Sequence, residues 1–470
     1  MQLLRPSLFR SPIIFAAALA ILAPRIAHSE ARLVIEADSG KVLEAENATV
    51  PWYPASVTKL MTAYVTLQAV KDGKLTLDTL LTVSPTAASQ SPSKMGFRPG
   101  TQVTVDNALK MMLVKSANDM AVVLAEGVGG SIDGFSVMMN DTAKRLGMVQ
   151  TSYVNPNGLP ADGQITSARD LAILARSFIK NLPEYEYFVH IPSIRFGKRI
   201  TQNFNRLIGR YPGADGFKTG FICASGYNLV ASATRDGRRL IAVVLGASSG
   251  TMRAVRAAQL LDRGFASNGL AWLRPSLGTV DQIQPIDASP PNLRDDVCGG
   301  KRHKPASDDD DAVVASRTIS GGSSSAAGDG TNAMFLASGL QAPLPKPSEW
   351  LAASPAPSEP IVVYTGPTRS GVGLVAAVAA DSANQDATSG KRGKRSRVAA
   401  KKPDAAADPG ATDASAKPAR KPAAVRHAAA KPDASATPAA QPADASAAKP
   451  AKPRTTAKPK PKVTDAKPPG

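Results

Sequence analysis

YPASVTKLMTAYV, residues 53–65, places Ser56 and Lys59 three positions apart at the start of a predicted helix. Apolar residues recur at helical spacing from position 57 onward, so the sequence predicts a central helix over 56–70 with one buried stripe. Ser56 and Lys59 share a different face, because residues i and i+3 of a helix are neighbours. A serine at a helix start also lies where the macrodipole favours developing negative charge. The stretch therefore suggests a serine nucleophile beside a lysine base.

Two further motifs support a catalytic role for this pair, because a Ser-x-x-Lys spacing alone is common by chance. The same spacing recurs without an expected catalytic role at Ser91/Lys94, Ser177/Lys180 and Ser446/Lys449. Ser116-Ala117-Asn118 follows about 60 residues after Ser56, and Lys218-Thr219-Gly220 follows about 100 residues later. A second Ser-Ala-Asn begins at position 382 in low-complexity sequence, whereas Lys-Thr-Gly is unique. The order and spacing of the three motifs are typical of penicillin-recognising serine enzymes.

The residues around these motifs narrow the comparison. The chain contains YPASVTKLMTAY, LVKSANDMAVVLAE, NPNGLPADGQITSARDLAILAR and ADGFKTGFICASGYNLVASA. These stretches resemble the low-molecular-mass penicillin-binding proteins that are D-alanyl-D-alanine carboxypeptidases, and the resemblance extends over residues 31–266. Members of that family commonly continue into a small β-rich domain and an amphipathic membrane anchor, and neither is evident in this sequence.

The resemblance implies a role for each residue of the first two motifs. Ser56 would attack the carbonyl of a terminal D-Ala-D-Ala bond and form an acyl-enzyme. Lys59 would be the base, and its pKa must then fall by about 3 units, which corresponds to roughly 4 kcal/mol. Burial and the second cation of the family, Lys218, can supply this shift. Ser116 would relay the proton to the departing amine, and Asn118 would bind the substrate amide.

The third motif is implied to hold the end of the peptide. Lys218 and Thr219 would bind its terminal carboxylate, while Gly220 would leave the strand face clear for the extended substrate. The backbone amides of Ser56 and Phe221 would form the oxyanion hole. The implied ligands are peptidoglycan stem peptides and β-lactam antibiotics, and no cofactor is implied.

Strand signals at both ends of this region and helical signals between them predict the fold. Residues 33–46 and 226–248 form hairpins, the second turning at Asp236-Gly237, and 250–266 form a closing amphipathic helix. Helices between them begin at capping residues Ser131 and Ser167. The predicted class is α/β (α+β), a β-lactamase/transpeptidase-like antiparallel sheet whose first strands pair with its last, with flanking helices and a helical insert.

Composition divides the chain into four parts. Residues 1–29 have the pattern of a signal peptide, so the chain is expected to be exported to the periplasm or cell envelope. Residues 30–268 are expected to form the catalytic domain, 269–390 a low-complexity linker that buries little apolar surface, and 391–470 a disordered basic tail. No permanent transmembrane helix is expected.

The tail carries most of the basic charge. It contains 19 Lys and Arg against 6 Asp, which is +13 of the chain's +18. Its expected partners are anionic envelope polymers or a membrane surface, although a solvated extension without a partner fits equally well. Nucleic-acid binding is not expected, because no aromatic residue follows Tyr364.

Several residues favour plain structural roles. Cys223 and Cys298 are expected to be two isolated thiols rather than a disulfide. Asp119 is expected only to cap a helix, and the turn containing Asn155, Asn157 and Gly158 is interpreted as structural. The sequence contains four histidines, of which one lies in the presumed catalytic domain, so neither a Ser/His triad nor a metal site is expected.

Three alternatives remain open. A class A β-lactamase needs a deacylating Glu, and the nearest candidates, Glu184 and Glu186, lack the surrounding pattern of that family. A transpeptidase or endopeptidase would differ only in its acyl acceptor or leaving group, which the motifs do not encode. A binding protein with an inactive catalytic domain is disfavoured, because all core catalytic residues are present.

Overall fold

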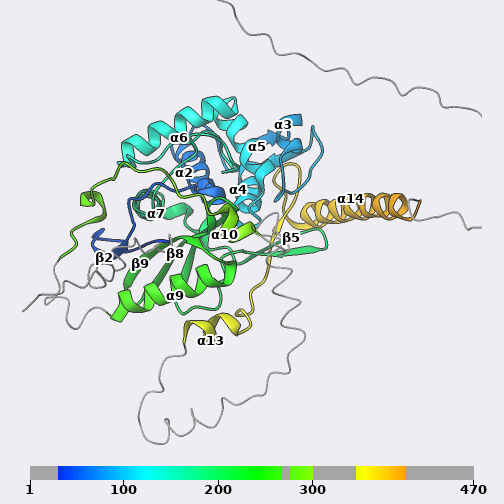
Figure 1. The fold of residues 1–470 in the computed structure, drawn as a ribbon. Helices are drawn as coiled ribbons and strands as arrows, with labels where there is room; N and C mark the ends of the chain where they lie inside the picture. Colours follow the sequence, from blue (N-terminus) through cyan, green and yellow to red (C-terminus); the bar gives the residue numbers. More distant parts are fainter. Residues whose placement is uncertain (1–29, 267–275, 300–345, 399–470) are drawn as a thin grey trace, which may run out of the picture. The chain divides into compact units, whose positions relative to one another are not determined.

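A five-stranded antiparallel sheet organises the domain. The computed structural model describes residues 30–266, 276–299 and 346–398 (Figure 1). The strand order is β2-β1-β9-β8-β7, so the N-terminal hairpin joins the three late strands through the pairing of β1 with β9. The strands are β1 (Ala31–Glu36), β2 (Val42–Glu46), β7 (Ala214–Ile222), β8 (Gly226–Arg235) and β9 (Arg238–Ala247). This arrangement confirms the predicted class.

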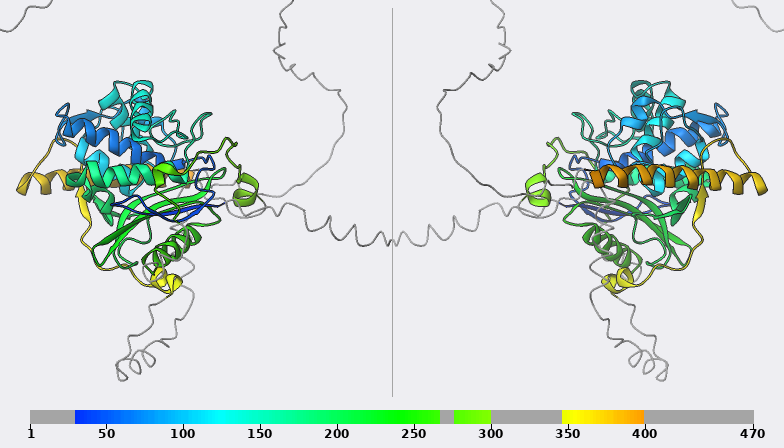
Figure 2. Two further views of the ribbon diagram at one scale, coloured as in Figure 1. Left: turned by 90° about the vertical axis from the view of Figure 1, so that its left-hand side faces the viewer. Right: turned by 90° about the vertical axis from the view of Figure 1, so that its right-hand side faces the viewer.

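Side-chain alternation gives each face of the sheet its own apolar core. On β1, Leu33 and Ile35 join the larger core, whereas Val34 joins the smaller one. Helix α9 (Gly250–Ala266) covers the smaller core, while α7 (Ala168–Asn181) covers the other face (Figures 1 and 2). The β8–β9 hairpin turns at Asp236 and Gly237, both at positive φ, as its sequence predicts.

The insert between β2 and β7 supplies the rest of the larger core. Its first part contains η1 (Ala55–Thr58), α2 (Lys59–Lys71), β3 (Leu80–Thr82), α3 (Pro85–Ser89), β4 (Gln102–Thr104) and α4 (Val105–Val114). Its second part contains α5 (Asn118–Gly129), α6 (Ile132–Leu146), α7, α8 (Tyr187–His190), β5 (Ser193–Phe196) and β6 (Arg199–Gln202). Ser131 and Ser167 cap α6 and α7 as predicted, each accepting a backbone N–H three residues on.

Helix α2 is buried on nearly every side rather than along one stripe. Lys59, Thr62 and Thr66 are as inaccessible as the apolar residues between them. Each fully buried Leu or Met side chain of this helix contributes about 1.5–3 kcal/mol. Such complete burial holds the start of the helix, and the nucleophile turn before it, in one position.

The predicted linker is not a segment without a core. Val280 and Leu293 are buried, and β10 (Ile361–Val363) pairs in parallel with β5. Short helices α10 (Arg294–Cys298) and α13 (Pro347–Ala352) and the long α14 (Gly371–Val398) also lie in residues beyond 268. The prediction failed because the apolar anchors are few and widely separated in Pro- and Ala-rich sequence, so they form no periodic pattern.

A disulfide joins Cys223, just after β7, to Cys298 of α10, at a sequence separation of 75. The prediction of two isolated thiols is therefore wrong. Leu293 donates its N–H to the carbonyl of Ala224 at 2.9 Å, which brings α10 beside the end of β7. The sequence could not show this, because the approach depends on contacts made by the predicted linker.

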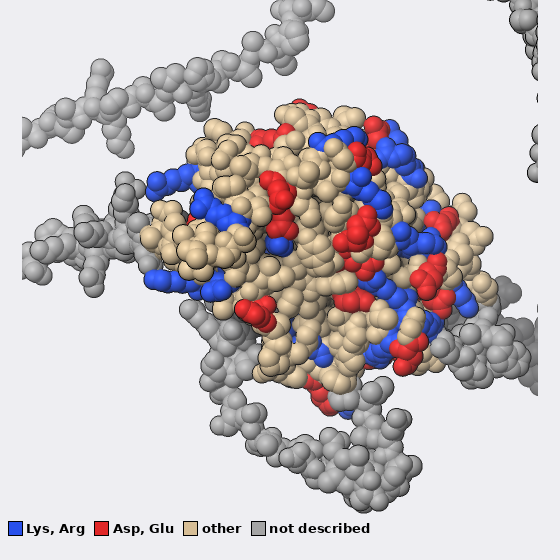
Figure 3. Space-filling model, turned by 180° about the vertical axis from the view of Figure 1, so that it is seen from behind, with Lys and Arg blue, Asp and Glu red and all other residues tan. Residues whose placement is uncertain are grey.

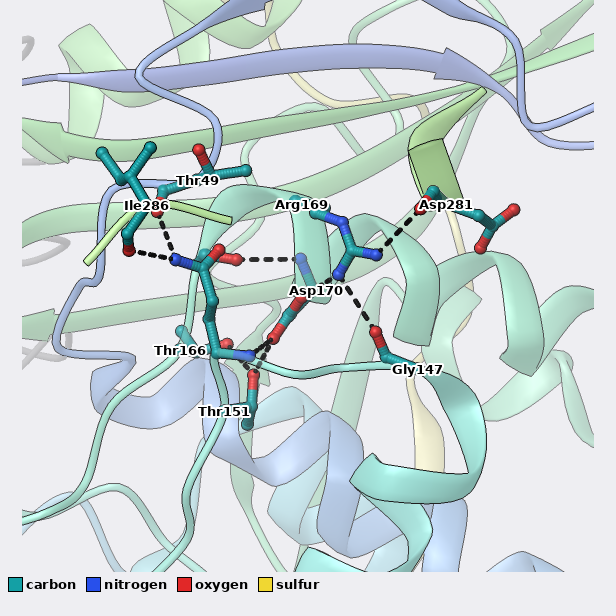
Figure 4. Close-up of polar contacts among 10 residues, drawn as sticks. Thr49, Gly147, Thr151, Thr166, Arg169, Asp170, Asp281 and Ile286 are labelled. Atoms are coloured by element: carbon teal, nitrogen blue, oxygen red, sulfur yellow. Dashed lines mark hydrogen bonds and ion pairs between the residues drawn. The ribbon is translucent and has the colours of Figure 1, made fainter. Parts of the chain in front are cut away.

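A polar network around the buried Arg169–Asp170 pair attaches residues 281–286 to the domain (Figure 4). Arg169 forms an ion pair with Asp170 at 2.8 Å and donates to the carbonyl of Asp281. Gln150 donates its side-chain amide to the carbonyls of Thr49 and Ile286. Burial raises the pKa of Asp170, and hydrogen bonds together with Arg169 act in the opposite direction.

The remaining features concern the surface and the ends of the chain. Acidic and basic residues are interspersed over the rear face (Figure 3). Residues 391–398 of the predicted tail belong to α14, whereas the predicted signal peptide and residues 399–470 lie outside the described residues. Within residues 30–266, 276–299 and 346–398, no single helix is long and apolar enough to span a membrane.

Candidate active site

The predicted nucleophile and base are in direct contact. Lys59 donates from Nζ to Ser56 Oγ at 2.8 Å. Ser56 lies in η1, partly accessible, whereas Lys59 is completely buried at the first position of α2. Burial disfavours an ammonium ion and so favours the amine that a base requires. The pair can therefore transfer the serine proton to lysine without a further group.

The turn at residues 155–158 contributes a backbone group that sequence analysis missed. The carbonyl of Asn157 accepts a 2.7 Å hydrogen bond from Lys59 Nζ, so the amine is held between two neutral oxygens. Gly158 has φ +80°, and a Cβ there would come within 1.8 Å of the Ala55 carbonyl oxygen. Glycine is required because this turn packs directly against the nucleophile turn. The interpretation of Asn157 as structural alone was incomplete.

Ser116 and Asn118 lie where α4 meets α5, and both helices pack against α2. Ser116 is buried at φ 59°, and its Oγ has no hydrogen-bond partner among the described residues. Asn118 donates Nδ2 to the carbonyl of Ser91 at 2.9 Å, and within the described chain its Oδ1 accepts nothing. Each residue thus keeps a polar atom for a ligand, since buried polar groups normally have partners.

Asp119 organises the loop beside Asn118, in addition to lying at the start of α5. Its carboxylate accepts the N–H groups of Met95 at 3.0 Å and Gly96 at 2.8 Å. Burial raises the pKa of Asp119, although the three backbone donors partly offset this effect. The prediction that Asp119 only caps a helix was wrong, because a single sequence does not show which loop folds back onto it.

The Lys218-Thr219-Gly220 motif lies on β7, the edge strand of the sheet. Lys218 and Thr219 are buried, and Lys218 Nζ donates to the carbonyl of Thr219 at 3.1 Å. A Cβ on Gly220 would be 2.9 Å from the backbone nitrogens of Ser56 and Val57. Strand β7 therefore passes the nucleophile turn in van der Waals contact, and the next residue, Phe221, follows at the same junction.

Two residues outside the motifs fix this junction. Asn228 on β8 donates Nδ2 to the carbonyls of Tyr53 at 2.9 Å and Pro54 at 3.2 Å. Buried Arg253 on α9 donates to the carbonyl of Gly220 at 3.3 Å. Neither residue belongs to a motif that can be recognised in the sequence. Both side chains bind backbone carbonyls of the nucleophile turn or of β7. A sequence pattern does not identify hydrogen-bond partners that are so far apart in the chain.

Two alternative chemistries, a metal site and a deacylating glutamate, have little support in the part of the chain described. It holds no group of three or more His, Cys, Asp or Glu side chains placed to bind a metal. Glu184 pairs with Lys71 at 3.0 Å on the surface, and Glu186 pairs with Arg239 at 2.7 Å. Both candidate deacylating carboxylates are thus engaged elsewhere.

Comparisons with known proteins agree with this geometry. A family model described as D-alanyl-D-alanine carboxypeptidase matches residues 19–249. The chain is 40% identical to the carboxypeptidase DacC of Escherichia coli, over 54% of this chain and 65% of DacC. It is 34% identical to DacB2 of Mycobacterium tuberculosis, over 50% of this chain and 82% of DacB2.

The fold is also similar to that of a solved penicillin-binding protein. Penicillin-binding protein 5 from Haemophilus influenzae superposes with a TM-score of 0.50 at 36% identity. The match covers 52% of this chain and 73% of that protein. The chain nevertheless spans slightly less than two thirds of the first curated relatives, with 65% of DacC and 63% of DacF from Bacillus subtilis.

Proposed function

Since the chain belongs to the D-alanyl-D-alanine carboxypeptidase family, we propose that it removes the terminal D-alanine from peptidoglycan pentapeptides through an acyl-enzyme on Ser56. The observation that carries this proposal is the 2.8 Å contact between Lys59 Nζ and Ser56 Oγ, with Lys59 buried against the Asn157 carbonyl. Such a pair supplies both nucleophile and base.

Acylation begins when Lys59 accepts the Ser56 proton and Oγ attacks the penultimate D-Ala carbonyl. The oxyanion is held by the N–H groups of Ser56 and Phe221. When the C–N bond breaks, Ser116 relays a proton to the departing amine and D-alanine leaves. Water then attacks the ester, and proton transfer back to Ser56 restores the enzyme and releases a tetrapeptide.

Substrate binding is assigned to the groups that surround this reaction. Lys218 and Thr219 hold the terminal carboxylate, which every substrate of a carboxypeptidase carries. Asn118, with its unpaired Oδ1, binds a substrate amide N–H. Gly220 lets β7, which carries these residues, approach the nucleophile turn closely, because a side chain there would collide with that turn.

β-Lactams should acylate the same serine, with opening of the lactam C–N bond. The ester should persist because Glu184 and Glu186 are both held in other ion pairs. These engagements favour a penicillin-binding carboxypeptidase over a β-lactamase.

Export to the periplasm or cell envelope is part of the proposal, because the polymer that carries the substrate lies there. Residues 1–29 would be the signal peptide and 30–268 the catalytic part. The basic residues 391–470 would contact anionic envelope polymers or a membrane surface.

Labelling with fluorescent penicillin, together with D-alanine release from a soluble pentapeptide, tests the function. Ser56→Ala should abolish both signals. Ser91→Ala should keep both, because only the backbone carbonyl of Ser91 contacts the site. Labelling of the Ser56 variant, or wild-type labelling without D-alanine release, would contradict the proposal. A parallel assay on crosslinked peptides would detect an endopeptidase.

A further inference from the structure

A pocket of about 240 Å³ adjoins the nucleophile turn and the end of β7. It lies between the entry to η1, the loop at residues 158–164 and the segment that follows the catalytic strand. Its walls include Tyr53, Ala55, Asp162, Ile222, Ala224 and Arg294. None of the roles proposed above uses its two charged side chains.

These two charges, Asp162 and Arg294, come from different segments. Both side chains are exposed, and among the described residues neither forms an ion pair or a side-chain hydrogen bond. An acid and a guanidinium that line one pocket without pairing with each other leave both charges available to a ligand. The complementary ligand carries a carboxylate and an ammonium together.

Arg294 is held beside the catalytic strand by two links to it. The Cys223–Cys298 disulfide ties α10 to the residue after β7. The neighbouring Leu293 donates its N–H to Ala224 at 2.9 Å. The guanidinium therefore extends from a backbone position that is fixed relative to the bound peptide.

The proposed reaction sets the direction of that peptide. With the terminal carboxylate at Lys218 and Thr219 and the reacting carbonyl beside Ser56, earlier substrate residues extend toward Ile222. An extended chain advances about 3.4 Å per residue. The residue before the two D-alanines therefore lies beside Ile222 and Ala224, at the mouth of the pocket.

We propose, building on the carboxypeptidase function, that this pocket selects a diamino dicarboxylic acid in the third position from the peptide's C-terminus. Arg294 binds the free carboxylate of its side-chain amino-acid centre, and Asp162 binds the ammonium. Meso-diaminopimelate carries both groups, whereas lysine carries only the ammonium and leaves Arg294 without a ligand.

The test compares two full-length pentapeptides that differ only in meso-diaminopimelate or L-lysine at that position. The wild-type chain should favour the first by at least about tenfold in kcat/KM, mainly through KM. Arg294→Gln should remove this preference, and Arg294→Lys should restore part of it. Arg199→Gln, which removes an exposed arginine of β6, should keep the preference and so controls for net charge.

Calorimetry with the Ser56→Ala chain measures binding of the same peptides without turnover. Selective binding of the diaminopimelate peptide that is lost in Arg294→Gln would support the pocket. Failure of the wild-type chain to release D-alanine would refute only the catalytic proposal. Equal affinity for both peptides, or selectivity that survives in Arg294→Gln, overturns the pocket assignment.

Discussion

Gly220→Ala perturbs the closest approach between the substrate strand and the nucleophile. The new Cβ would lie 2.9 Å from the backbone nitrogens of Ser56 and Val57 and 3.0 Å from the Pro54 carbonyl. Ordinary contact begins near 3.4 Å, so β7 and η1 must separate by about 0.5 Å. No flexible side-chain end is available to move instead, because all three neighbours are backbone atoms.

The expected cost follows from the groups that this separation moves. A 0.5 Å shift lengthens a hydrogen bond of about 2.9 Å to about 3.4 Å, which nearly removes it. Loss of one oxyanion donor lowers the rate by about 10²–10³. We therefore expect acylation by fluorescent penicillin to slow about 100-fold, which corresponds to roughly 2.7 kcal/mol. Strain from overpacking should lower the free energy of unfolding by about 1–3 kcal/mol.

Stopped-time labelling measures the acylation rate, and urea unfolding shows whether the variant is folded. Gly373→Ala on α14 is the matched control, because its added Cβ meets nothing closer than 3.9 Å. A folded Gly220→Ala protein that acylates at the wild-type rate would show that the contact does not position the oxyanion donors. The assignment of the Phe221 N–H would then fail.

Three further predictions concern stability. Asp170→Asn should lower the free energy of unfolding in urea by about 3 kcal/mol, because its buried arginine partner loses a counter-charge; Arg263→Gln, in an exposed pair, should cost below about 1 kcal/mol. Burial lowers the pKa of His190, so the folded protein binds this proton at lower pH than the unfolded chain, and stability falls as pH drops below 6.5. His190→Gln should reduce the slope of the free energy of unfolding against pH by up to about 1 kcal/mol per pH unit, after allowance for solvent screening. An unchanged slope would show that the titration of His190 does not cause the loss of stability. The Cys223→Ala/Cys298→Ala double variant should lose up to about 4 kcal/mol, because the bridge closes a 75-residue loop; equal stability before and after reduction of the wild type would oppose it.

The sequence predicted the parts of the fold that have local signals. The hairpin turning at Asp236-Gly237 and the capped helices depend on residues close together in the chain, and the structure confirms them. The near-complete burial of α2 was not predictable, because Thr62 and Thr66 look like a polar face until other helices cover them. The core contributed by residues beyond 268 was missed because isolated anchors such as Val280 leave no periodicity.

The same distinction applies to the site. Ser56, Lys59 and the other motif residues could be named because their side-chain chemistry is unusual in that order. Asn157 was missed as a lysine partner because its contribution is a carbonyl, which every residue has. Asn228 and Arg253 were missed because they hold backbone groups of segments distant in sequence.

The pairing of β10 with β5 joins two segments of the chain that are far apart in sequence. Tyr364 donates its backbone N–H to the Asn107 side chain, and Gly366 donates to the carbonyl of Gln102, so the later segment is attached to the insert beyond the strand pairing as well. A protease cut between positions 300 and 345 would leave two polypeptides that remain associated. We therefore expect a separately expressed fragment that contains residues 346–398 to bind a fragment that ends at residue 299.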